Sequence, residues 1–485
     1  MTRPPAAVPA PVPARITSIV GFLVVTELAS GITQGWISPL LPSFIERYGL
    51  TSADANWITA SALLSTVVCV PLLSKLGDVY GHKRLLVVAA SLVALGSVIV
   101  ALAPSFPLLL VGRVLQGAIT AFLPLEFAIV RERAGERAGR AIGLLVGALT
   151  IGGSLGLLLA GVARQFLGLT ATLWIPAVMM IVVVLLLARL VPETTVRRPG
   201  GIDWPGAVLL AVGLVLFLGA VGNGSRWGWG DARTLVGILG GLALLVVWGR
   251  VENRTTHPLV PLDVLRRGGQ GLPLLVAFVF GAHLFGSSAP TAVFLGTDPA
   301  ATGFGLGLTG AALGGALLVL GAFMFLATTI AARLAERVGE TAVLVTGTLI
   351  SAVSYLLTAL LHVDAALVLL WQAGLGFGGG LVAATLPTIV VERAPRDSVG
   401  ILSGLYNTAR TAAGAVAGAV FAAVMSALVM TGSNGKAVAA ESAYVAVWCI
   451  CAGLAIVVAA LAIGVRRGAR AAGAVQAEVT AEVPA

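Results

Sequence analysis

LGDVYG at residues 76–81 returns as LAERVG at residues 334–339, so each copy reads leucine, a small residue, an acid, two further residues and glycine. Each copy directly follows a long apolar run. If two helices are inserted in the middle of the chain, both copies become the loop after the second helix of a six-helix set. The pattern therefore predicts a duplicated chain that carries a two-helix insertion.

The apolar runs beside these loops indicate a protein that crosses a membrane many times. Of the 485 residues, 58% are hydrophobic and 11% are charged, against about 25% charged in an ordinary soluble domain. Mean hydropathy is +1.01. We expect an all-α membrane protein of two six-helix bundles plus two inserted helices. Apolar stretches of roughly 18 or more residues predict fourteen spans, near residues 16–40, 54–75, 85–104, 107–130, 140–163, 169–191, 204–222, 233–250, 273–295, 308–332, 341–362, 364–391, 399–430 and 443–465.

Basic residues lie mainly in alternate loops. Of the 30 Lys and Arg residues, 23 lie in the tails and in the loops after even-numbered spans, and 5 lie in the loops after odd-numbered spans. The remaining two, Arg113 and Arg410, lie inside spans. Because Lys and Arg concentrate in cytoplasmic loops, we expect a cell-membrane protein with both termini in the cytoplasm. The net charge of +9 then reflects topology, and no nucleic-acid partner is expected.

The spans divide the chain into five segments, and no loop is long enough for a soluble domain. These segments are a cytoplasmic tail at 1–15, an N-terminal six-helix bundle at 16–191, an inserted helix pair with its linkers at 192–272, a C-terminal six-helix bundle at 273–465 and a cytoplasmic tail at 466–485. Any activity must therefore reside in the membrane. No metal cluster, nucleophile with a base, or phosphate-binding loop is recognisable, so we expect no enzyme, no metal and no cofactor.

Ionisable residues inside the spans are the first candidates for function, because a charge at the bilayer centre costs at least about 2.5 kcal/mol. Glu27 lies about twelve residues past Arg15, hence roughly 18 Å into the membrane at 1.5 Å per residue. Gln34 returns to within about 20° of the same helix face. The first span thus carries one polar stripe, which we expect to border a cavity.

Two other spans carry polar faces of this kind: Arg113 with Gln116 and Thr120, and Ser403 with Asn407 and Arg410. At about 100° per residue, each set lies on one side of its helix. One interpretation is functional, with these groups lining a cavity. The alternative is structural, with Glu27 and Arg113 forming a buried pair that sets the helix register.

Glu126 and His283 are weaker candidates. Glu126 lies about 220° around its helix from Arg113 and shortly before Arg131, so a salt bridge at the cytoplasmic rim is an equal alternative. His283 lies on the span that the repeat makes equivalent to the first span. It either lines the same cavity or serves as a hydrogen-bonded structural residue.

Glycines in small-xxx-small patterns mark two spans that the repeat makes equivalent. Gly152, Gly156 and Gly161 lie in the fifth span, and Gly414 and Gly418 lie in the thirteenth. Such patterns let helix backbones approach each other closely. We therefore expect a glycine-rich seam between the two halves, along which they slide or rock.

The loop at residues 74–84 resembles the signature G-x-L-A-D-R-x-G-R-K of the major facilitator superfamily. The residues that match this signature are Asp78, Gly81, Lys83 and Arg84, and those that depart from it are Ser74, Val79 and His82. The second copy of the loop has Glu336, Arg337 and Gly339 at the equivalent positions.

The fourth span carries Arg113-Val114-Leu115-Gln116-Gly117, which resembles the R-x-x-Q-G signature of proton-driven exporters in that superfamily. With fourteen spans and the segment Asn407-Thr408-Ala409-Arg410, the whole chain is similar to the fourteen-helix drug:proton antiporter family. Two positions depart from that family's pattern. The stretch at 156–161 lacks the proline and one glycine of G-P-x-x-G-G, and Glu27 lies further from Leu41-Pro42 than the usual first-helix acid.

This resemblance implies alternating access, in which two bundles rock about a central cavity. It implies that Asp78 and its neighbouring cations latch the cytoplasmic side in the outward-facing state, and that Glu27 or another membrane acid carries the proton. The implied function is proton-coupled efflux of small amphipathic or cationic compounds, with a small-molecule substrate, protons and the lipid bilayer as partners and a monomer as the working unit. The alternatives are an importer or facilitator on the same fold, or a membrane sensor that does not transport.

Overall fold

The computed structural model describes residues 13–134, 138–194, 203–256, 271–392, 399–433 and 437–481, together with positions 201, 258 and 435. The first half of the chain forms α1 (Pro13–Gly35), the short 3-10 helix η1 (Ser38–Leu40), α2 (Leu41–Tyr48), α3 (Ser52–Tyr80), α4 (His82–Leu102), α5 (Phe106–Gln116), the 3-10 helix η2 (Gly117–Ala121), α6 (Phe122–Ala134) and α7 (Ala138–Leu190).

The described remainder of the chain is helical as well, apart from one hairpin. Strands β1 (Val429–Thr431) and β2 (Ala437–Ala439) pair antiparallel, with Met430 opposite Val438. The helices are α8 (Trp204–Trp227), α9 (Ala232–Glu252), α11 (Gly271–Gly286), α12 (Ser288–Gly296), α13 (Pro299–Thr302), α14 (Gly310–Val338), α15 (Glu340–Leu360), α16 (Ala365–Glu392), α17 (Val399–Ala427) and α18 (Glu441–Ala481).

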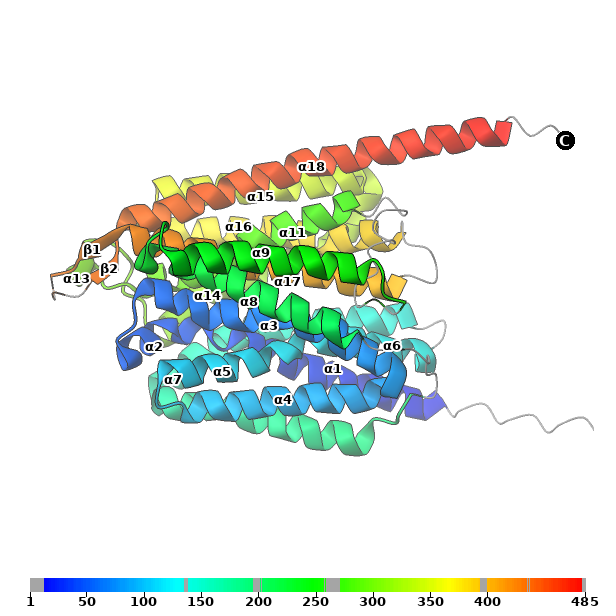
Figure 1. The fold of residues 1–485 in the computed structure, drawn as a ribbon, viewed down its shortest axis with the longest axis horizontal. Coiled ribbons are helices and arrows are strands. Elements are labelled where there is room, and N and C mark those ends of the chain that lie inside the picture. Colours follow the sequence, from blue (N-terminus) through cyan, green and yellow to red (C-terminus); the bar gives the residue numbers. More distant parts are fainter. Residues whose placement is uncertain are drawn as a thin grey trace, which may run out of the picture.

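The long helices run along one common axis, and α1 begins at the same end of the bundle at which α18 finishes (Figure 1). We call this end the termini face, and we call the opposite end, which carries the β1–β2 hairpin, the hairpin face. Helix α18 projects beyond the bundle at the termini face (Figure 1). The segment 466–485, expected to be a tail, is therefore helical as far as Ala481.

Thirteen helical segments of the described chain are long and apolar enough to cross a membrane. One of them, Leu144–Leu190, has 47 residues, more than twice the ~20 that one crossing needs. Gly168 divides it, because its backbone leaves the helical region with φ 71° and ψ 172°. Counted as two, this segment brings the total to fourteen crossings, and the all-α membrane fold is confirmed.

Short polar side chains begin several of these helices. The Asp54 carboxylate accepts a hydrogen bond from the Thr51 backbone N–H (2.9 Å), and the Thr51 hydroxyl accepts one from the Asp54 backbone N–H (3.2 Å). Asp203 and Asp231 likewise accept from one backbone N–H each at the starts of α8 and α9. The first N–H groups of a helix have no carbonyl partner within it. These caps therefore help to set where each apolar helix begins.

The repeated loop has the same backbone geometry in both halves. Helices α3 and α14 each have 29 residues, and α4 and α15 each have 21. Between them stand Gly81 with φ 106° and Gly339 with φ 86°. Each glycine N–H donates to the carbonyl four residues earlier, at 2.9 and 2.8 Å. Because L side chains rarely adopt this φ, the glycine of the repeat turns the chain from one crossing into the next.

The two halves share a large apolar core near the hairpin face. One cluster of buried side chains there contains Trp36 and Phe44 from the first half together with Val293 and Phe294 from the second. Towards the termini face, the larger buried clusters of the described chain each draw on one half. The halves are therefore sealed against each other mainly at the hairpin face.

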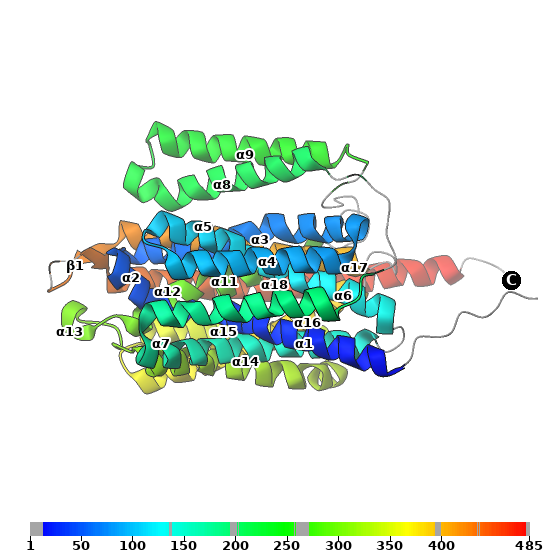
Figure 2. The same cartoon turned by 90° about the horizontal axis from the view of Figure 1, so that it is seen from below.

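Helices α8 and α9 form a pair on one flank, beside the main bundle (Figure 2). Helix α8 lies next to the bundle, where Leu218 packs with Leu63 of α3 and Ala415 of α17. Because α3 belongs to the first half and α17 to the second, the helix pair covers a line along which the halves meet. Helix α9 lies outside α8 and exposes apolar side chains such as Val236 and Leu239.

Candidate functional site

Two acidic side chains meet inside the first half. The Glu27 carboxyl on α1 and the Glu126 carboxyl on α6 interact with each other, and Glu27 also interacts with the Ser30 hydroxyl. Glu27 is 1% exposed and Glu126 is 0% exposed. None of the four carboxyl oxygens has a hydrogen-bond partner in the described chain. The site is therefore a pair of buried acids with no cation beside it among the described residues.

Such a pair has a defined chemistry. Two ionised carboxylates in contact repel each other, and burial removes the water that would screen them. A proton held by one carboxyl relieves this repulsion, because the protonated group donates a hydrogen bond to its neighbour. The pair can therefore hold a proton in the membrane interior, and it can release that proton when its surroundings become polar.

Glu27 is connected along α1 to Gln34, the other residue of the predicted polar stripe. The Gln34 side-chain amide donates a hydrogen bond to the Ser30 hydroxyl (3.1 Å), and Ser30 in turn interacts with Glu27. Ser30 is fully buried, whereas Gln34 is exposed. The stripe therefore links an open position on α1 to the buried acid pair.

The rim salt bridge considered for Glu126 is wrong. Arg131 is exposed, whereas Glu126 is fully buried against Glu27. A five-residue 3-10 helix, η2, lies between Arg113 and Glu126. A 3-10 helix turns by about 120° per residue instead of about 100°, so η2 adds about 100° of rotation. This rotation moves Glu126 from about 220° to about 320° from Arg113, so the angle expected for one continuous α-helix does not apply.

The buried pair considered for Glu27 and Arg113 is also wrong. The Arg113 Nε donates to the Ile58 carbonyl oxygen (2.8 Å), and its Nη1 donates to the Gln116 side-chain oxygen. The Gln116 amide donates to the Ser97 hydroxyl (2.9 Å). Two of the three residues predicted on this face, Arg113 and Gln116, therefore bind neutral groups, and they tie α5 to α3 and α4.

In the second half, Arg410 and Asn407 lie together on α17. The Arg410 Nη2 donates to the Asn407 side-chain oxygen (3.0 Å). The guanidinium carbon lies 5.2 Å from the ring centre of Phe285 and 5.5 Å from that of Tyr406. The side chain of Ser403, the third residue expected on this face, lies outside the described residues.

His283 packs inside the second half and does not face the acid pair. Its ring contacts the Phe280 and Tyr355 rings edge-on, at 5.3 and 5.7 Å between centres. Its backbone carbonyl, at the break between α11 and α12, accepts from the Ser287 hydroxyl (2.7 Å) and the Tyr355 hydroxyl (2.8 Å). Neither ring nitrogen has a hydrogen-bond partner in the described chain. Of the two alternatives considered for His283, the buried ring among aromatic side chains does not fit the lining of a cavity shared with Glu27, and its unpartnered nitrogens do not fit a hydrogen-bonded structural residue.

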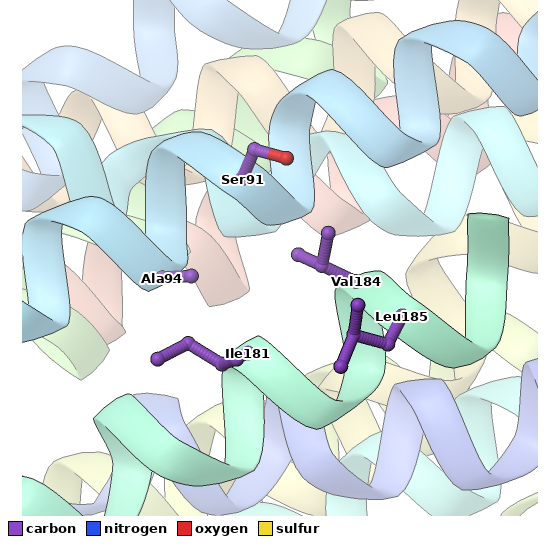
Figure 3. A pocket seen from close by; sticks show the side chains of 5 residues that line it. All are labelled: Ser91, Ala94, Ile181, Val184 and Leu185. Atoms are coloured by element: carbon purple, nitrogen blue, oxygen red, sulfur yellow. The ribbon is translucent and has the colours of Figure 1, made fainter.

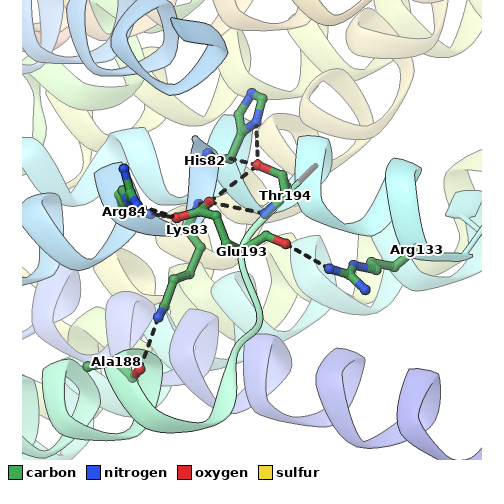
Figure 4. A network of polar contacts seen from close by, with 7 residues as sticks. All are labelled: His82, Lys83, Arg84, Arg133, Ala188, Glu193 and Thr194. Carbon is green, nitrogen blue, oxygen red and sulfur yellow. Dashed lines mark hydrogen bonds and ion pairs between the residues drawn. The ribbon is translucent and has the colours of Figure 1, made fainter. Parts of the chain in front are cut away.

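The loop after α3 is held by a carboxylate that the sequence analysis did not identify. Glu193, just after α7, accepts hydrogen bonds from the Lys83 and Arg84 backbone N–H groups at 3.1 and 3.2 Å (Figure 4). Arg133 Nη2 donates to the Glu193 carbonyl oxygen (2.7 Å). A carboxylate is favoured at a helix N-terminus, where backbone N–H groups lack partners. Glu193 therefore joins α4, α6 and α7 at the termini face.

The acid of the loop motif, Asp78, pairs locally. Its Oδ1 lies 3.2 Å from His82 Nε2, and the His82 backbone N–H donates to the Thr194 hydroxyl (3.1 Å). The Lys83 ammonium donates to the Ala188 carbonyl oxygen (3.0 Å; Figure 4). These contacts remain within the first half.

The equivalent loop of the second half has fewer contacts. Glu336 and Arg337 are both exposed, and neither forms an ion pair within the described residues. The backbone turn at Gly339 is retained. The two copies therefore share a turn but differ in the side chains that hold it.

The predicted glycines divide between two kinds of contact. Gly152 and Gly156 face the backbone of α1, at the Leu28 and Ile32 carbonyls, within the first half. Gly161 faces the backbone of α14 in the other half, at Gly310 and Gly314. On α17, a side-chain carbon at Gly418 would lie 3.2 Å from Ala60 of α3, and one at Gly414 would lie 2.6 Å from Phe285 and 3.1 Å from Leu63. Close contact between the halves thus occurs at Gly161, Gly414 and Gly418.

A small hollow of about 170 Å³ lies between α4 and the second part of α7 (Figure 3). It is lined by Ser91, Ala94, Ile181, Val184 and Leu185. Ser91, Ile181 and Leu185 are exposed on the outside of the bundle, and the Ser91 hydroxyl already donates to the Val87 carbonyl (2.8 Å). The hollow is therefore an apolar groove on the outer surface, and it is separate from the acid pair.

Comparisons with known proteins agree with this architecture. The Cephamycin export protein CmcT of Amycolatopsis lactamdurans is 30% identical over 423 residues, which cover 84% of this chain and 83% of that one. The Tetracenomycin C resistance and export protein of Streptomyces glaucescens is 27% identical over 384 residues, covering 77% and 69%. Among solved structures, the human organic anion transporter MFSD10 aligns with a TM-score of 0.62 at 18% identity over 92% of this chain and 99% of its own.

The solved structure of the nucleoside transporter NupG matches in the same way, with a TM-score of 0.65 at 14% identity, covering 92% of this chain and 98% of that one. At these identities the structural matches establish the fold alone. The family model described as Major Facilitator Superfamily matches residues 23–419, most of the chain. The chain therefore belongs to the Major Facilitator Superfamily, whose members are membrane transporters of small molecules.

Proposed function

We propose that this chain exports small amphipathic compounds in exchange for protons, by alternating access between its two faces. The names of both relatives described above contain the word export, and both relatives align with most of this chain. Because transport proteins of this fold bind their cargo between two halves, we assign the substrate to the interface between the two halves. The working unit in this proposal is a monomer.

The acid pair Glu27–Glu126 is the observation that supports proton coupling. A coupling group must take up a proton from one side and release it to the other. The two carboxyls are buried together without a neighbouring cation in the described chain, so a bound proton lowers their repulsion. Entry of water or of substrate along the polar stripe at Ser30 and Gln34 would supply polar partners and favour release.

The arrangement of the halves supports a proposal about which face is closed in the resting state. The shared apolar core lies near the hairpin face, so this structure is closed there. The asymmetry of basic residues supports a cytoplasmic location for the termini face. In this orientation, the chain rests closed to the outside, and the Glu193 and Asp78 contacts hold the loops on the cytoplasmic side.

Flux in proteoliposomes tests this proposal. The purified full-length chain is reconstituted into vesicles with an acidic lumen, and uptake of the dye rhodamine 6G and of the dye sulforhodamine B is followed. We expect at least one dye to accumulate above its level in protein-free vesicles and to leak out when nigericin collapses the pH gradient. Accumulation that survives nigericin would contradict proton coupling, and uptake equal to that of empty vesicles would contradict transport.

A further inference from the structure

Arg410 has more hydrogen-bond donors than the protein uses. A guanidinium carries five N–H donors and no acceptor. In the described chain, Arg410 has one side-chain hydrogen bond, from Nη2 to Asn407, and its Nε is buried without a partner. None of the ion pairs found among the described residues involves Arg410. Arg410 is therefore a cation in the interior of a membrane protein, and part of its hydrogen-bonding capacity is unused in the described chain.

Tyr406, beside Arg410, carries a second polar group that has no hydrogen-bond partner in the described chain. Its side chain is 6% exposed, and its ring lies against the guanidinium. The hydroxyl interacts with Arg410, but its own proton has no acceptor within the described part of the chain. The Arg410 Nε and the Tyr406 hydroxyl, on neighbouring side chains of α17, therefore both lie without a hydrogen-bond partner in the described chain.

Arg113 shows what a structural arginine looks like in this molecule. It is 9% exposed, and it donates to the Ile58 carbonyl and to Gln116. Arg410 is more exposed than Arg113, although it lies about 17 Å along α17 at 1.5 Å per residue. Arg410 is therefore partly accessible at membrane depth, whereas Arg113 is buried and hydrogen-bonded to its neighbours.

The position of Arg410 places it beside the contact between the halves. The α11 backbone at Gly281 packs directly on the Arg410 backbone carbonyl, which fixes the start of the side chain. One helical turn further on, Gly414 lies next to Leu63 of α3, in the other half. A ligand bound at Arg410 would therefore lie close to the surface that changes when the halves rock.

We propose that Arg410 and Tyr406 bind the anionic oxygens, carboxylate or sulfonate, of the amphipathic substrate, with the Phe285 ring as an apolar wall beside them. Guanidinium forks match such planar or three-fold oxygen groups and bind them with charge-assisted hydrogen bonds. This inference deepens the proposed function, on which it rests for the cargo role of the ligand. It favours an anionic cargo over the cationic one that the sequence analysis considered.

Binding of two xanthene dyes with opposite charge tests the inference without any gradient. The anionic sulforhodamine B and the cationic rhodamine 6G are titrated with the detergent-solubilised full-length chain, and fluorescence anisotropy is recorded. We expect sulforhodamine B to bind more tightly than rhodamine 6G. Arg410→Gln should weaken sulforhodamine B binding by about tenfold or more, because a charge-assisted hydrogen bond is lost. Arg410→Lys should retain part of the affinity, and Tyr406→Phe should lose less than Arg410→Gln.

The control is Arg164→Gln, which also removes one arginine from a membrane helix. Arg164 lies on α7 and donates to the Ser43 hydroxyl (3.0 Å), away from Arg410. We expect this variant to bind both dyes as the parent chain does, and thermal unfolding of each variant shows that it is folded. An Arg410→Gln variant that is folded and binds sulforhodamine B unchanged would overturn the inference, as would tighter binding of rhodamine 6G by the parent chain or binding of neither dye. Selective binding of sulforhodamine B without gradient-driven flux would instead contradict only the proposed function.

Discussion

Glu27 of α1 and Glu126 of α6 hold their carboxyl groups against each other in the interior of the first half. Both side chains are almost completely buried, and no described cation stands beside them. A pair of this kind titrates as one unit. Substitution of either member should therefore alter the same function, and the two substitutions together should add little.

Glu27→Gln should abolish accumulation against a gradient. The amide cannot exchange a proton, so we expect pH-driven uptake in proteoliposomes to fall to the level of equilibration, while exchange down a substrate gradient remains measurable. Glu126→Gln should reduce pH-driven uptake as well, and the double variant should resemble Glu27→Gln. Glu46→Gln is the matched control, because Glu46 lies exposed on α2. Full uphill transport by Glu27→Gln would make Glu27 a structural residue.

Asp78→Asn should slow transport while folding and expression persist. The change removes the charge that faces His82 at 3.2 Å, and with it the acid that the proposed cytoplasmic latch needs when the halves close. The comparison variant is Glu336→Gln, which should do less because Glu336 is exposed and has no ion pair in the described chain. The initial rate of dye uptake is measured for both variants. Equal rates in the parent chain and in Asp78→Asn would show that the loop is only a turn.

Gly81→Ala should destabilise the first half. Gly81 has φ 106°, and a side-chain carbon there would lie 2.6 Å from the Glu193 carboxylate. We expect a loss of about 1–3 kcal/mol from backbone strain and displacement of Glu193, seen as a lower unfolding temperature in detergent. Gly21→Ala is the control, since no atom lies within 4 Å of the added carbon. A Gly81→Ala chain as stable as Gly21→Ala would refute this role of the turn.

Gly161→Ala should disturb the contact between the halves. The added methyl group would meet the α14 backbone at Gly310 and, 3.0 Å away, at Gly314. Overpacking of this kind costs about 1–3 kcal/mol, and here it falls on the surface along which the halves meet. We expect slower transport than in Gly147→Ala, where the same helix has open space around the added carbon. Indistinguishable uptake rates would mean that α7 and α14 can move apart freely.

The topology is tested by reporter fusions after positions 197 and 470. The alternation of basic loops in the sequence assigns both positions to the side with 23 of the 30 basic residues, so we expect both fusions to report a cytoplasmic location. A fusion after position 230, in the turn between α8 and α9, should report the opposite side. An external signal at 197 or at 470 would contradict the assignment of the termini face.

The positions of the fourteen crossings could be predicted from the sequence because apolar run length is a local property. The partner of Glu27 could not be predicted in this way. Counted at about 100° per residue, Glu126 stands about 220° from Arg113. With η2 included, the angle is about 320°, which is close to the Arg113 side. Nothing in Gly117–Ala121 marks these residues as a 3-10 helix, so the error follows from assuming one continuous α-helix.

Glu193 was missed for a different reason. It accepts a hydrogen bond from Lys83 in the first turn of α4, 110 residues earlier in the chain, and the sequence around it shows only an acid after an apolar run. Its role exists only once α4 and α7 are packed side by side. The loop motif could be identified from the sequence, whereas the group that holds it depends on the tertiary structure.

The apolar cluster shared by the two halves near the hairpin face has a thermal consequence. To open that face, the chain must divide the cluster that contains Trp36 and Phe44 on one side and Val293 on the other. Newly wetted apolar surface raises the heat capacity, and apolar association weakens on cooling. The polar contacts of Glu193 and Asp78 at the termini face do not weaken on cooling in this way. Cooling should therefore raise the population of chains open at the hairpin face, and warming should hold that face shut.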